Sequence, residues 1–497
     1  MKTFEFDQTV KTRPAVLRDV MVEATRPRAR KSTPAPPAPV PEETAEAEAR
    51  QTEALSERAV RLAEFYRGKI ETVPKVPVRS LKDFSLWYTP GIAAVSKDIA
   101  REASRAFDLT GRWNTIAILT DGSRVLGLGN IGPQAALPVM EGKALLFKYL
   151  GGVDAIPLPV DVATPEALIE TAMRIYPAFG GINLEDIASP KCFQVLEELQ
   201  RRLPIPVWHD DQLGTAAATL AGLINALQLT GRKLSNVRTV MLGAGAANLV
   251  TVRLLLRMGQ DPHLLTVVDH KGILHAERED MDELQLHNRW KYRVALDTDG
   301  GGRKGTLADA MAGADVILAA STPVPGTIRP EWVRSMAPHP IVFALANPVP
   351  EIWPADAHAA GAAVVATGRS DFPNQVNNSL IFPCVFRGVL DARARSIPDE
   401  IVIAAAEELA RSASVRGMTD QHLLPTMDER EVFPHVAAAV ADATVRLGIA
   451  RVRASREEFY ERARRFMARP VGLTEALQKS GLVDPMPDEP VPPRKPR

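Results

Sequence analysis

Residues 237–258, VRTVMLGAGAANLVTVRLLLRM, set the fold class of this chain. The segment opens with an apolar run that predicts a buried strand and closes with the pattern of a helix. The turn between them carries the glycines of a dinucleotide fingerprint, although Asn248 stands at the third position, where glycine or alanine is usual. Gly243 permits the tight turn, and Gly245 lets the backbone approach a pyrophosphate, whose charge the helix start attracts. The segment therefore predicts a nucleotide-binding unit in an α/β protein.

The nucleotide prediction needs more than the glycines, because a glycine-rich turn alone often only joins a strand to a helix. The strand, the helix and an acid that ends the next apolar run, 264–268, together favour a nucleotide. That acid, Asp269, suits a hydrogen bond to a ribose 2′-hydroxyl, which predicts NAD as the preferred coenzyme. NADP stays open, because His270 or Lys271 could bind a 2′-phosphate. The expected coenzyme contacts are Asp269 and the turn residues Gly243, Ala244, Gly245, Ala246, Ala247 and Asn248.

Apolar runs on both sides of this unit predict two domains of the α/β class. The runs beyond residue 212 alternate with helical patterns and lie at 237–242, 264–268, 315–319, 341–345 and 363–366. This alternation favours a Rossmann-like domain with a doubly wound parallel sheet over residues 212–440. Runs at 115–119 and 155–160 predict a smaller N-terminal α/β substrate domain over residues 51–211.

The two ends of the chain have the composition of unfolded segments. Residues 1–50 are rich in Pro, Ala and Glu, and residues 484–497 are rich in proline and charge. Neither segment has enough apolar surface to bury, so a disordered extension and a disordered tail are expected. Residues 441–483 look helical and are expected to pack on the body of the protein.

The composition excludes several classes of protein. The 497 residues include 60 basic and 60 acidic side chains, and this zero net charge argues against a nucleic-acid binder. The sequence offers no stretch of about 18 apolar residues to span a membrane and no secretory signal. The cysteines, Cys192 and Cys384, are too few for a disulfide framework and fit a reducing compartment. We therefore expect a cytoplasmic protein without membrane or nucleic-acid partners.

Two pairs of adjacent acids, Glu185-Asp186 and Asp210-Asp211, each follow an apolar run. Carboxylate oxygens are the ligands that Mg²⁺ and Mn²⁺ prefer, which makes Glu185, Asp186 and Asp211 candidate metal ligands. Either pair alone could equally cap a helix or lie on a solvated surface. Zinc is disfavoured because His209 has no second histidine or cysteine at ligand spacing.

Two basic residues lie where they could act on a substrate. Arg124 belongs to a glycine-rich loop, 120–132, and could bind a substrate carboxylate bidentately or be an ordinary surface arginine. Lys143 starts an apolar helical run, where partial burial would lower its pKa and make it a usable general base. The alternative for Lys143 is a stem that packs while the ammonium reaches water.

Motifs in chain order favour one of these interpretations. They are SLWYTPG (85–91), EGKALLFK (141–148), INLEDI (182–187), HDDQLGTA (209–216), ALANP (344–348) and FPNQVNNSLIFP (372–383). With the 120–132 loop and the GAGAAN turn, they resemble the malic enzyme family in its compact bacterial form. The resemblance extends over roughly residues 75–395.

The resemblance implies roles for individual residues. The general acid and general base it implies are Tyr88 and Lys143. The implied ligands of a Mg²⁺ or Mn²⁺ ion are Glu185, Asp186 and Asp211. The implied contacts to the substrate and to the nicotinamide side are Arg124, Asn347 and Asn377, with Asn347 also contacting the coenzyme.

The activity that the resemblance implies is oxidative decarboxylation of (S)-malate to pyruvate and CO2, with a divalent metal and reduction of NAD(P). A homodimer or larger homo-oligomer is implied as well. Other interpretations stay open: a malolactic enzyme that forms lactate and CO2, a dehydrogenase that does not decarboxylate, and a non-catalytic malate-binding regulator. The last has no need of a tyrosine and a lysine that transfer protons.

Overall fold

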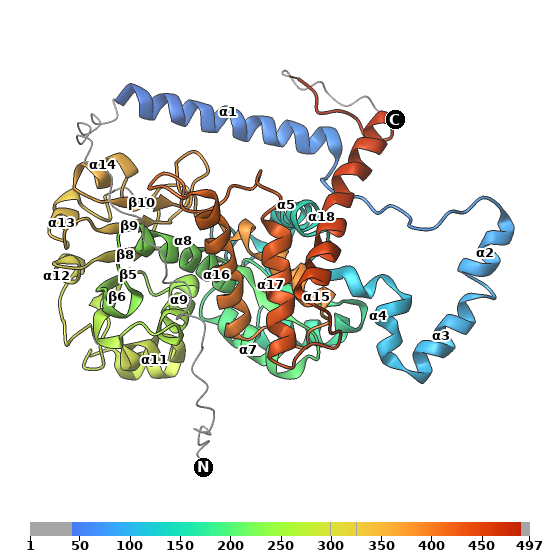
Figure 1. Cartoon of the computed structure of the whole chain (residues 1–497), viewed down its shortest axis with the longest axis horizontal. Helices are drawn as coiled ribbons and strands as arrows, with labels where there is room; N and C mark the ends of the chain where they lie inside the picture. The colour runs from blue at the N-terminus through green and yellow to red at the C-terminus, as the bar shows by residue number, and fades with distance from the viewer. Residues whose placement is uncertain (1–41, 299, 325, 489–497) are drawn as a thin grey trace, which may run out of the picture. The chain divides into compact units, whose positions relative to one another are not determined.

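The computed structural model of the chain describes residues 42–488 other than 299 and 325, and its strands form two sheets (Figure 1). The first sheet has the order β2-β1-β3-β4, and all of its strand pairs are parallel. Its strands are β1 (Thr115–Thr120), β2 (Asp154–Pro159), β3 (Gly181–Leu184) and β4 (Val207–His209). Because the carboxyl ends of parallel strands share one edge, the segments that follow β1, β3 and β4 meet there.

Crossover helices connect the strands of this four-stranded sheet. They are α5 (Gly132–Gly151), α6 (Pro165–Ile175) and α7 (Lys191–Arg202). The chain moves one way along the sheet from β1 to β2 and the other way from β2 to β3 and β4. Right-handed crossovers therefore place α5 on one face of the sheet and α6 with α7 on the other.

The second sheet has the order β10-β9-β8-β5-β6-β7, and only the two-residue β7 runs antiparallel. Its strands are β5 (Thr239–Leu242), β6 (Leu265–Asp269), β7 (Gly272–Ile273), β8 (Val316–Ala319), β9 (Ile341–Ala344) and β10 (Val364–Thr367). All five apolar runs that predict strands beyond residue 212 form strands, and the expected α/β class with a Rossmann-like sheet is confirmed.

Helices cover both faces of the six-stranded sheet, as double winding requires. One face packs on α8 (Thr215–Leu229) and α9 (Ala246–Arg257). Farther along the chain, α10 (Met281–His287) leads to α11 (Arg289–Asp297), which packs on α9. The other face packs on α12 (Leu307–Met311), α13 (Pro330–Arg334) and α14 (Pro354–Ala359). Side chains of β5 alternate between the two cores: Met241 enters the first, whereas Val240 and Leu242 enter the second.

The chain then returns to the first sheet through α15 (Phe382–Asp391), α16 (Asp399–Arg416), α17 (Phe433–Arg446) and α18 (Arg456–Lys479). The Phe382 ring lies 4.6 Å from that of Phe147 on α5, and buried Arg387 donates to Asn114 Oδ1 at 2.6 Å. The range expected for the coenzyme domain, 212–440, therefore includes helices that cover the other sheet. Periodicity along the chain shows which face of a helix is apolar, but not which sheet that face meets.

The N-terminal helix α1 (Glu42–Tyr66) begins inside the segment expected to be disordered, residues 1–50. Glu and Ala dominate residues 42–50 and are strong helix formers, so helix propensity outweighs the lack of apolar side chains there. Tyr66 donates to the carbonyl of Asp484 at 3.2 Å, so the first residue of the expected tail has a partner. The rest of that extension and tail, residues 1–41 and 489–497, lies outside the described residues.

Between α1 and the first sheet, α2 (Leu81–Trp87) and α3 (Ile92–Arg101) stand apart from the other elements, and the short α4 (Ala106–Leu109) leads back to β1 (Figure 1). No residue from 69 to 104, all of them described, is buried. Of the helices that the structure describes, none combines the length and the hydropathy needed to cross a membrane.

Candidate active site

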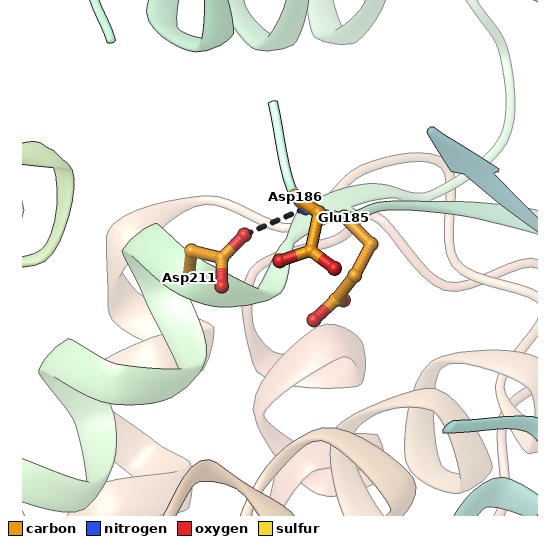
Figure 2. Close-up of side chains that lie close together, drawn as sticks. All are labelled: Glu185, Asp186 and Asp211. Carbon is orange, nitrogen blue, oxygen red and sulfur yellow. Dashed lines mark hydrogen bonds between the residues drawn. The ribbon is translucent and has the colours of Figure 1, made fainter. Parts of the chain in front are cut away.

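Carboxylates gather at the carboxyl edge of the four-stranded sheet. Glu185 and Asp186 follow β3, and Asp211 lies in η5 (Asp210–Gly214), a single turn of π-helix directly after β4. Each of the three acids offers an oxygen, and these oxygens lie within 4.8 Å of one another. Figure 2 shows the three side chains grouped together, with the backbone N–H of Asp186 donating to Asp211 Oδ2 at 2.9 Å. The structure therefore brings together the three acids that the sequence singles out.

The backbone around Asp186 is strained. Asp186 has φ of 54° and Leu126 has φ of 49°, in the left-handed region that side chains with a Cβ avoid. The two residues face each other: the Leu126 N–H lies 3.5 Å from Asp186 Oδ1, and the Arg124 N–H donates to the Asp186 carbonyl at 3.0 Å. The loop predicted to line the site is therefore fixed against the acids, and the exposed Arg124 side chain starts beside them.

Lys143 is buried on α5, with 8% of its side chain exposed, and it faces these acids. Its Nζ lies 2.8 Å from Glu185 Oε1, forms an ion pair with Asp210 Oδ2, and sits 4.2 Å from the ring centroid of Phe382. Burial alone would lower the pKa of Lys143, but the two carboxylates outweigh it and raise that pKa above its ordinary value. The expectation that burial lowers it is wrong for this state, because the sequence does not show which anions the ammonium meets.

Asp210 and Asp211 point to different partners although they are adjacent. Asp210 is fully buried and accepts a hydrogen bond from Trp208 Nε1 at 3.0 Å, besides its contact with Lys143. Its carboxylate occupies the space where a Cβ on Gly214 would lie, so this packing requires glycine. The side chain of Asp211 is 40% exposed and joins the other two acids instead.

The acid cluster suits a hard divalent cation. Burial raises the pKa of Glu185 well above its ordinary value and that of Asp186 to about 7, because each carboxylate loses water and lies near the others. Among the described residues, Asp186 Oδ2 has no hydrogen-bond donor, so a buried oxygen is left for a cation. Burial lowers the pKa of the neighbouring His209 to about 4, so its ring adds no positive charge. Oxygen ligands with surplus negative charge fit Mg²⁺ or Mn²⁺.

The dinucleotide-type turn joins β5 to α9. Gly243 has φ of 100°, and a Cβ there would lie 2.7 Å from the carbonyl oxygen of Ala320. Asn248 Nδ2 donates to the carbonyls of Leu242 and Gly243 at 2.7 and 2.9 Å. The residue that departs from the usual fingerprint thus holds the turn closed with its side chain. Beside Gly245, no described atom lies within 4 Å of an added Cβ, so that side of the turn is open.

Asp269 ends β6, as predicted, but its carboxylate is already occupied. Arg278 Nη1 donates to Asp269 Oδ1 at 2.9 Å, Lys291 forms an ion pair with Oδ2, and the Lys271 N–H donates at 2.8 Å. Burial opposes the charged form of Asp269, but these partners lower its pKa. Sequence reasoning missed Arg278 and Lys291, because nothing in their spacing links them to the end of β6.

Asn347 and Asn377 lie on loops of the second sheet that approach the acid-bearing segments. Asn347 is exposed after β9, and a Cβ on Gly127, in the loop that holds Asp186, would lie 3.6 Å from its carbonyl oxygen. Asn377 caps η8 (Asn378–Leu380) by accepting from the Ser379 N–H at 2.8 Å. A Cβ on Gly214 would lie 3.1 Å from that of Asn378, so η8 packs on η5. Asn347 therefore lies beside the loop that holds Asp186, and Asn377 caps the turn that packs on the segment of Asp211.

Tyr88, the predicted general acid, is not brought to the acids or to the predicted base, Lys143. It ends α2, its side chain is 70% exposed, and its backbone N–H donates to the carbonyl of Phe84. Between Tyr88 and Lys143, both described, the structure has no hydrogen bond or ring contact.

Two family models match the chain. The model described as "Malic enzyme, N-terminal domain" matches residues 67–200, and the model described as "Malic enzyme, NAD binding domain" matches residues 213–445. Together they cover the six-stranded sheet and three strands of the four-stranded sheet, and β4 lies between the two matches.

Relatives and a solved structure agree with these matches. A bifunctional malic/malolactic enzyme of Bacillus subtilis is 46% identical over 412 residues, which are 83% of this chain and 98% of that protein. An NAD-dependent malic enzyme of Geobacillus stearothermophilus is 46% identical (77% of this chain, 78% of that protein), and an NADP-dependent malic enzyme of Halomonas elongata is 43% identical (77% and 92%). The crystal structure of Entamoeba histolytica malic enzyme superposes with a TM-score of 0.86 at 41% identity, covering 92% of this chain and 94% of that one.

Proposed function

Because the chain belongs to the malic enzyme family, we propose that it oxidatively decarboxylates (S)-malate to pyruvate and CO2 while reducing a nicotinamide coenzyme. One observation supports this most strongly: a buried lysine contacts a cluster of carboxylates that could bind a cation, at the carboxyl edge of the four-stranded sheet. Lys143, Glu185, Asp186 and Asp211 form this arrangement. A binding protein has no reason to bury an ion-paired lysine there, because burying charges is costly.

Glu185, Asp186 and Asp211 would hold the divalent cation. A bound Mg²⁺ or Mn²⁺ supplies Lewis-acid chemistry, polarising the oxygen on C2 of the substrate. Asp210 stays outside this set, because its carboxylate is committed to Lys143 and Trp208. Its negative charge keeps the lysine ammonium in place when Glu185 is engaged by a cation.

Lys143 would accept the proton of the C2 hydroxyl. For this it must be neutral, and the anions beside it are what keep it charged in the present state. A cation bound to Glu185 would offset one of these negative charges and would therefore lower the pKa of Lys143. Burial of Lys143 then acts in the same direction, because a buried ammonium loses its hydration.

The remaining site residues would bind and protonate. Arg124 would hold a carboxylate of malate through its guanidinium, which can form two parallel hydrogen bonds. Asn347 and Asn377 would donate side-chain amide hydrogen bonds from the opposite side, where the coenzyme domain meets the acids. Tyr88 would give a proton to C3 after CO2 has left, which completes pyruvate.

The coenzyme would lie on the turn from Gly243 to Asn248, and we expect NAD to be preferred. Asp269 at the end of β6 places negative charge where a 2′-phosphate would lie. Arg278 and Lys291 offset much of that charge, so the discrimination against NADP should be modest.

A malolactic outcome is the second candidate, because the relative from Bacillus subtilis carries both names. The two buried free cysteines suit a cytoplasmic location.

A single assay with malate and Mn²⁺, using NAD and NADP in turn, tests the proposal. We expect NADH and pyruvate to form in equal amounts, with a lower kcat/KM for NADP. Lactate formation without accumulation of NADH would replace the proposed activity by the malolactic one. Malate binding without any turnover would leave only a regulator.

A further inference from the structure

Glu351 is a fully buried acid of the six-stranded sheet domain that has no part in the proposed chemistry. One carboxylate oxygen, Oε1, accepts hydrogen bonds from the backbone N–H and the hydroxyl of Ser321 at 2.7 and 2.9 Å. The other, Oε2, accepts from the backbone N–H of Ala346 at 3.1 Å. Burying a carboxylate is costly unless hydrogen bonds replace its hydration. These bonds therefore hold the side chain in one position.

The donors to Glu351 belong to the loops that follow two neighbouring strands. Ser321 lies two residues after the end of β8, and Ala346 lies two residues after the end of β9. The two strands pair in parallel, so both loops leave the same edge of the sheet. The backbone carbonyl of Glu351 also accepts from the Ile328 N–H at 2.9 Å. One residue therefore holds the loop after β8 at two points and joins it to the loop after β9.

The loop after β8 borders the crevice in which a coenzyme is expected. From β5 the chain passes to β6 on one side and later to β8 on the other, so the strand order reverses between β5 and β8. In doubly wound sheets, ligands bind outside the carboxyl ends of the strands at this point. The loops after β5 and β8 approach closely there, because a Cβ on Gly243 would lie 2.7 Å from the carbonyl oxygen of Ala320. Glu351 thus fixes Ser321, the residue next to this contact.

The loop after β9 carries Asn347, directly after Ala346. Prolines in the segment 347–350 restrict the backbone, and the Glu351 carboxylate closes the loop back on its own start. The Asn347 side chain lies against the loop after β10, since a Cβ on Gly368 would lie 2.5 Å from Asn347 Nδ2. The backbone beside Asn347 therefore depends on Glu351 for its position.

The arrangement around Glu351 requires a carboxylate and not an amide. Each of its two oxygens faces a backbone N–H, one from Ser321 and one from Ala346, and a backbone N–H can only donate. In Glu351→Gln one oxygen becomes an NH2 group, which would face a donor in either orientation of the amide. An unpaired buried donor is costly, so one of the two loops would move away.

We propose that Glu351 is a positioning residue, which sets the coenzyme crevice and Asn347 relative to each other so that the nicotinamide is held beside the hydrogen on C2 of malate. Because Glu351 is buried, it acts through the two loops and not by contact with malate or the coenzyme. The inference rests on the proposed function, which gives Asn347 its place beside the nicotinamide. Hydride transfer is sensitive to such positioning, because the reacting atoms must lie about 3–3.5 Å apart.

Glu351→Gln tests the proposal, with Glu331→Gln as the matched control on α13, where the side chain is 58% exposed. Full-length proteins are assayed with malate, Mn²⁺ and NAD. For Glu351→Gln we expect kcat to fall by about 10–100-fold and the KM for NAD to rise. The deuterium isotope effect on kcat, measured with malate labelled at C2, should increase because hydride transfer becomes the slow step. Glu331→Gln should behave as the wild-type protein.

The Mn²⁺ requirement separates positioning of the coenzyme from general damage. The acids of the cation cluster follow strands of the other sheet, so the Mn²⁺ concentration for half-maximal activity should not change in Glu351→Gln. A lowered melting temperature with an unchanged KM for NAD and an unchanged isotope effect would overturn the proposal and leave Glu351 a stabilising role alone.

Glu351→Asp separates reach from charge and decides the matter if Glu351→Gln does not fold. This variant keeps the negative charge but lacks one methylene, so its carboxylate can hold one loop and not both. We expect it to raise the KM for NAD and the isotope effect as well. Wild-type kinetics in either folded variant would overturn the proposal. Failure of the proposed function is distinct, since the wild-type protein would then not oxidise malate at all.

Discussion

The acid–lysine cluster and the segment of residues 76–104, here called the arm, are opposite in construction. In the cluster, the charges of Lys143, Glu185 and Asp210 are buried and paired, and Gly214 is fitted to the Asp210 carboxylate. In the arm, apolar side chains are exposed, and among the described residues no hydrogen bond joins Tyr88 to another predicted site residue. The cluster is held in place by buried ion pairs, whereas the arm has no buried side chain to fix it. The motifs therefore include residues that packing fixes in place and one, Tyr88, that packing leaves exposed.

Replacing Lys143 should have the largest effect. Lys143→Ala removes the proposed base and leaves two buried carboxylates without their cation, so we expect malate oxidation to fall by about 10³-fold or more. The free energy of unfolding of the metal-free protein should fall by about 3–5 kcal/mol. Denaturant unfolding and steady-state kinetics measure the two losses. Lys148→Ala is the control on the same helix: its partly exposed ion pair with Asp154 should contribute no more than about 1 kcal/mol.

Replacing Tyr88 should separate activity from stability. Tyr88→Phe is expected to lower kcat by about 10²–10⁴-fold, because a proton donor is lost. The melting temperature should stay unchanged, since the hydroxyl belongs to an exposed side chain. Tyr149→Phe gives the reverse control, because the hydroxyl of Tyr149 lies 2.7 Å from that of Thr474 and belongs to no predicted site residue. Thermal unfolding and steady-state kinetics are measured on both variants. A Tyr88→Phe protein with a lowered melting temperature and normal turnover would contradict the role of Tyr88 as a proton donor.

The cation requirement should depend on Asp211 and on pH. Asp211→Asn should raise the Mn²⁺ concentration for half-maximal activity by about 10–100-fold.

Burial raises the pKa of Asp186 to about 7, so protons compete with the cation and its affinity should weaken as the pH falls through 7. Without metal, the folded state binds this proton more tightly than the unfolded state does, so stability should fall as the pH rises from about 4 to 7. Calorimetric titration with Mn²⁺ at several pH values measures the affinity, and a pH-independent affinity would remove Asp186 from the ligand set.

The smallest effect should be on coenzyme choice. Asp269→Ala leaves Arg278 and Lys291 without their shared anion, so the ratio of kcat/KM for NADP to that for NAD should rise about tenfold. Asp261→Ala is the control, since Asp261 only caps a short turn before β6. An unchanged ratio in Asp269→Ala would show that β6 does not read the ribose. Such a result would leave the acid–lysine cluster and the arm unaffected.

Much of the fold can be predicted from the sequence, because apolar runs bounded by turns leave few alternatives. The strands of the second sheet and the positions of the acids at strand ends follow in this way. Local patterns do not show long-range partners, however. The raised pKa of Lys143 depends on Asp210, and the partners of Asp269 lie on later helices. The packing of α15 on α5 is of the same kind.

The site residues differ in how well the sequence predicts their surroundings. The acids Glu185, Asp186 and Asp211 come together because they follow two neighbouring parallel strands. The carboxyl ends of such strands lie at the same edge of the sheet. Tyr88 has no such constraint, because the segments around it are short helices without buried residues. The motif around Tyr88 implies its role, but it does not predict where the side chain lies relative to the acids.

Malate oxidation with and without Mn²⁺ tests most directly whether the acid–lysine cluster is the active site. Wild-type protein stripped of metal is assayed with malate and NAD, and Mn²⁺ is then returned to it and to Asp211→Asn. We expect no NADH without the cation, full activity of the wild-type protein on its return, and a higher Mn²⁺ requirement in Asp211→Asn. Equal activity of the metal-free and the Mn²⁺-loaded protein would contradict a catalytic role for the cluster.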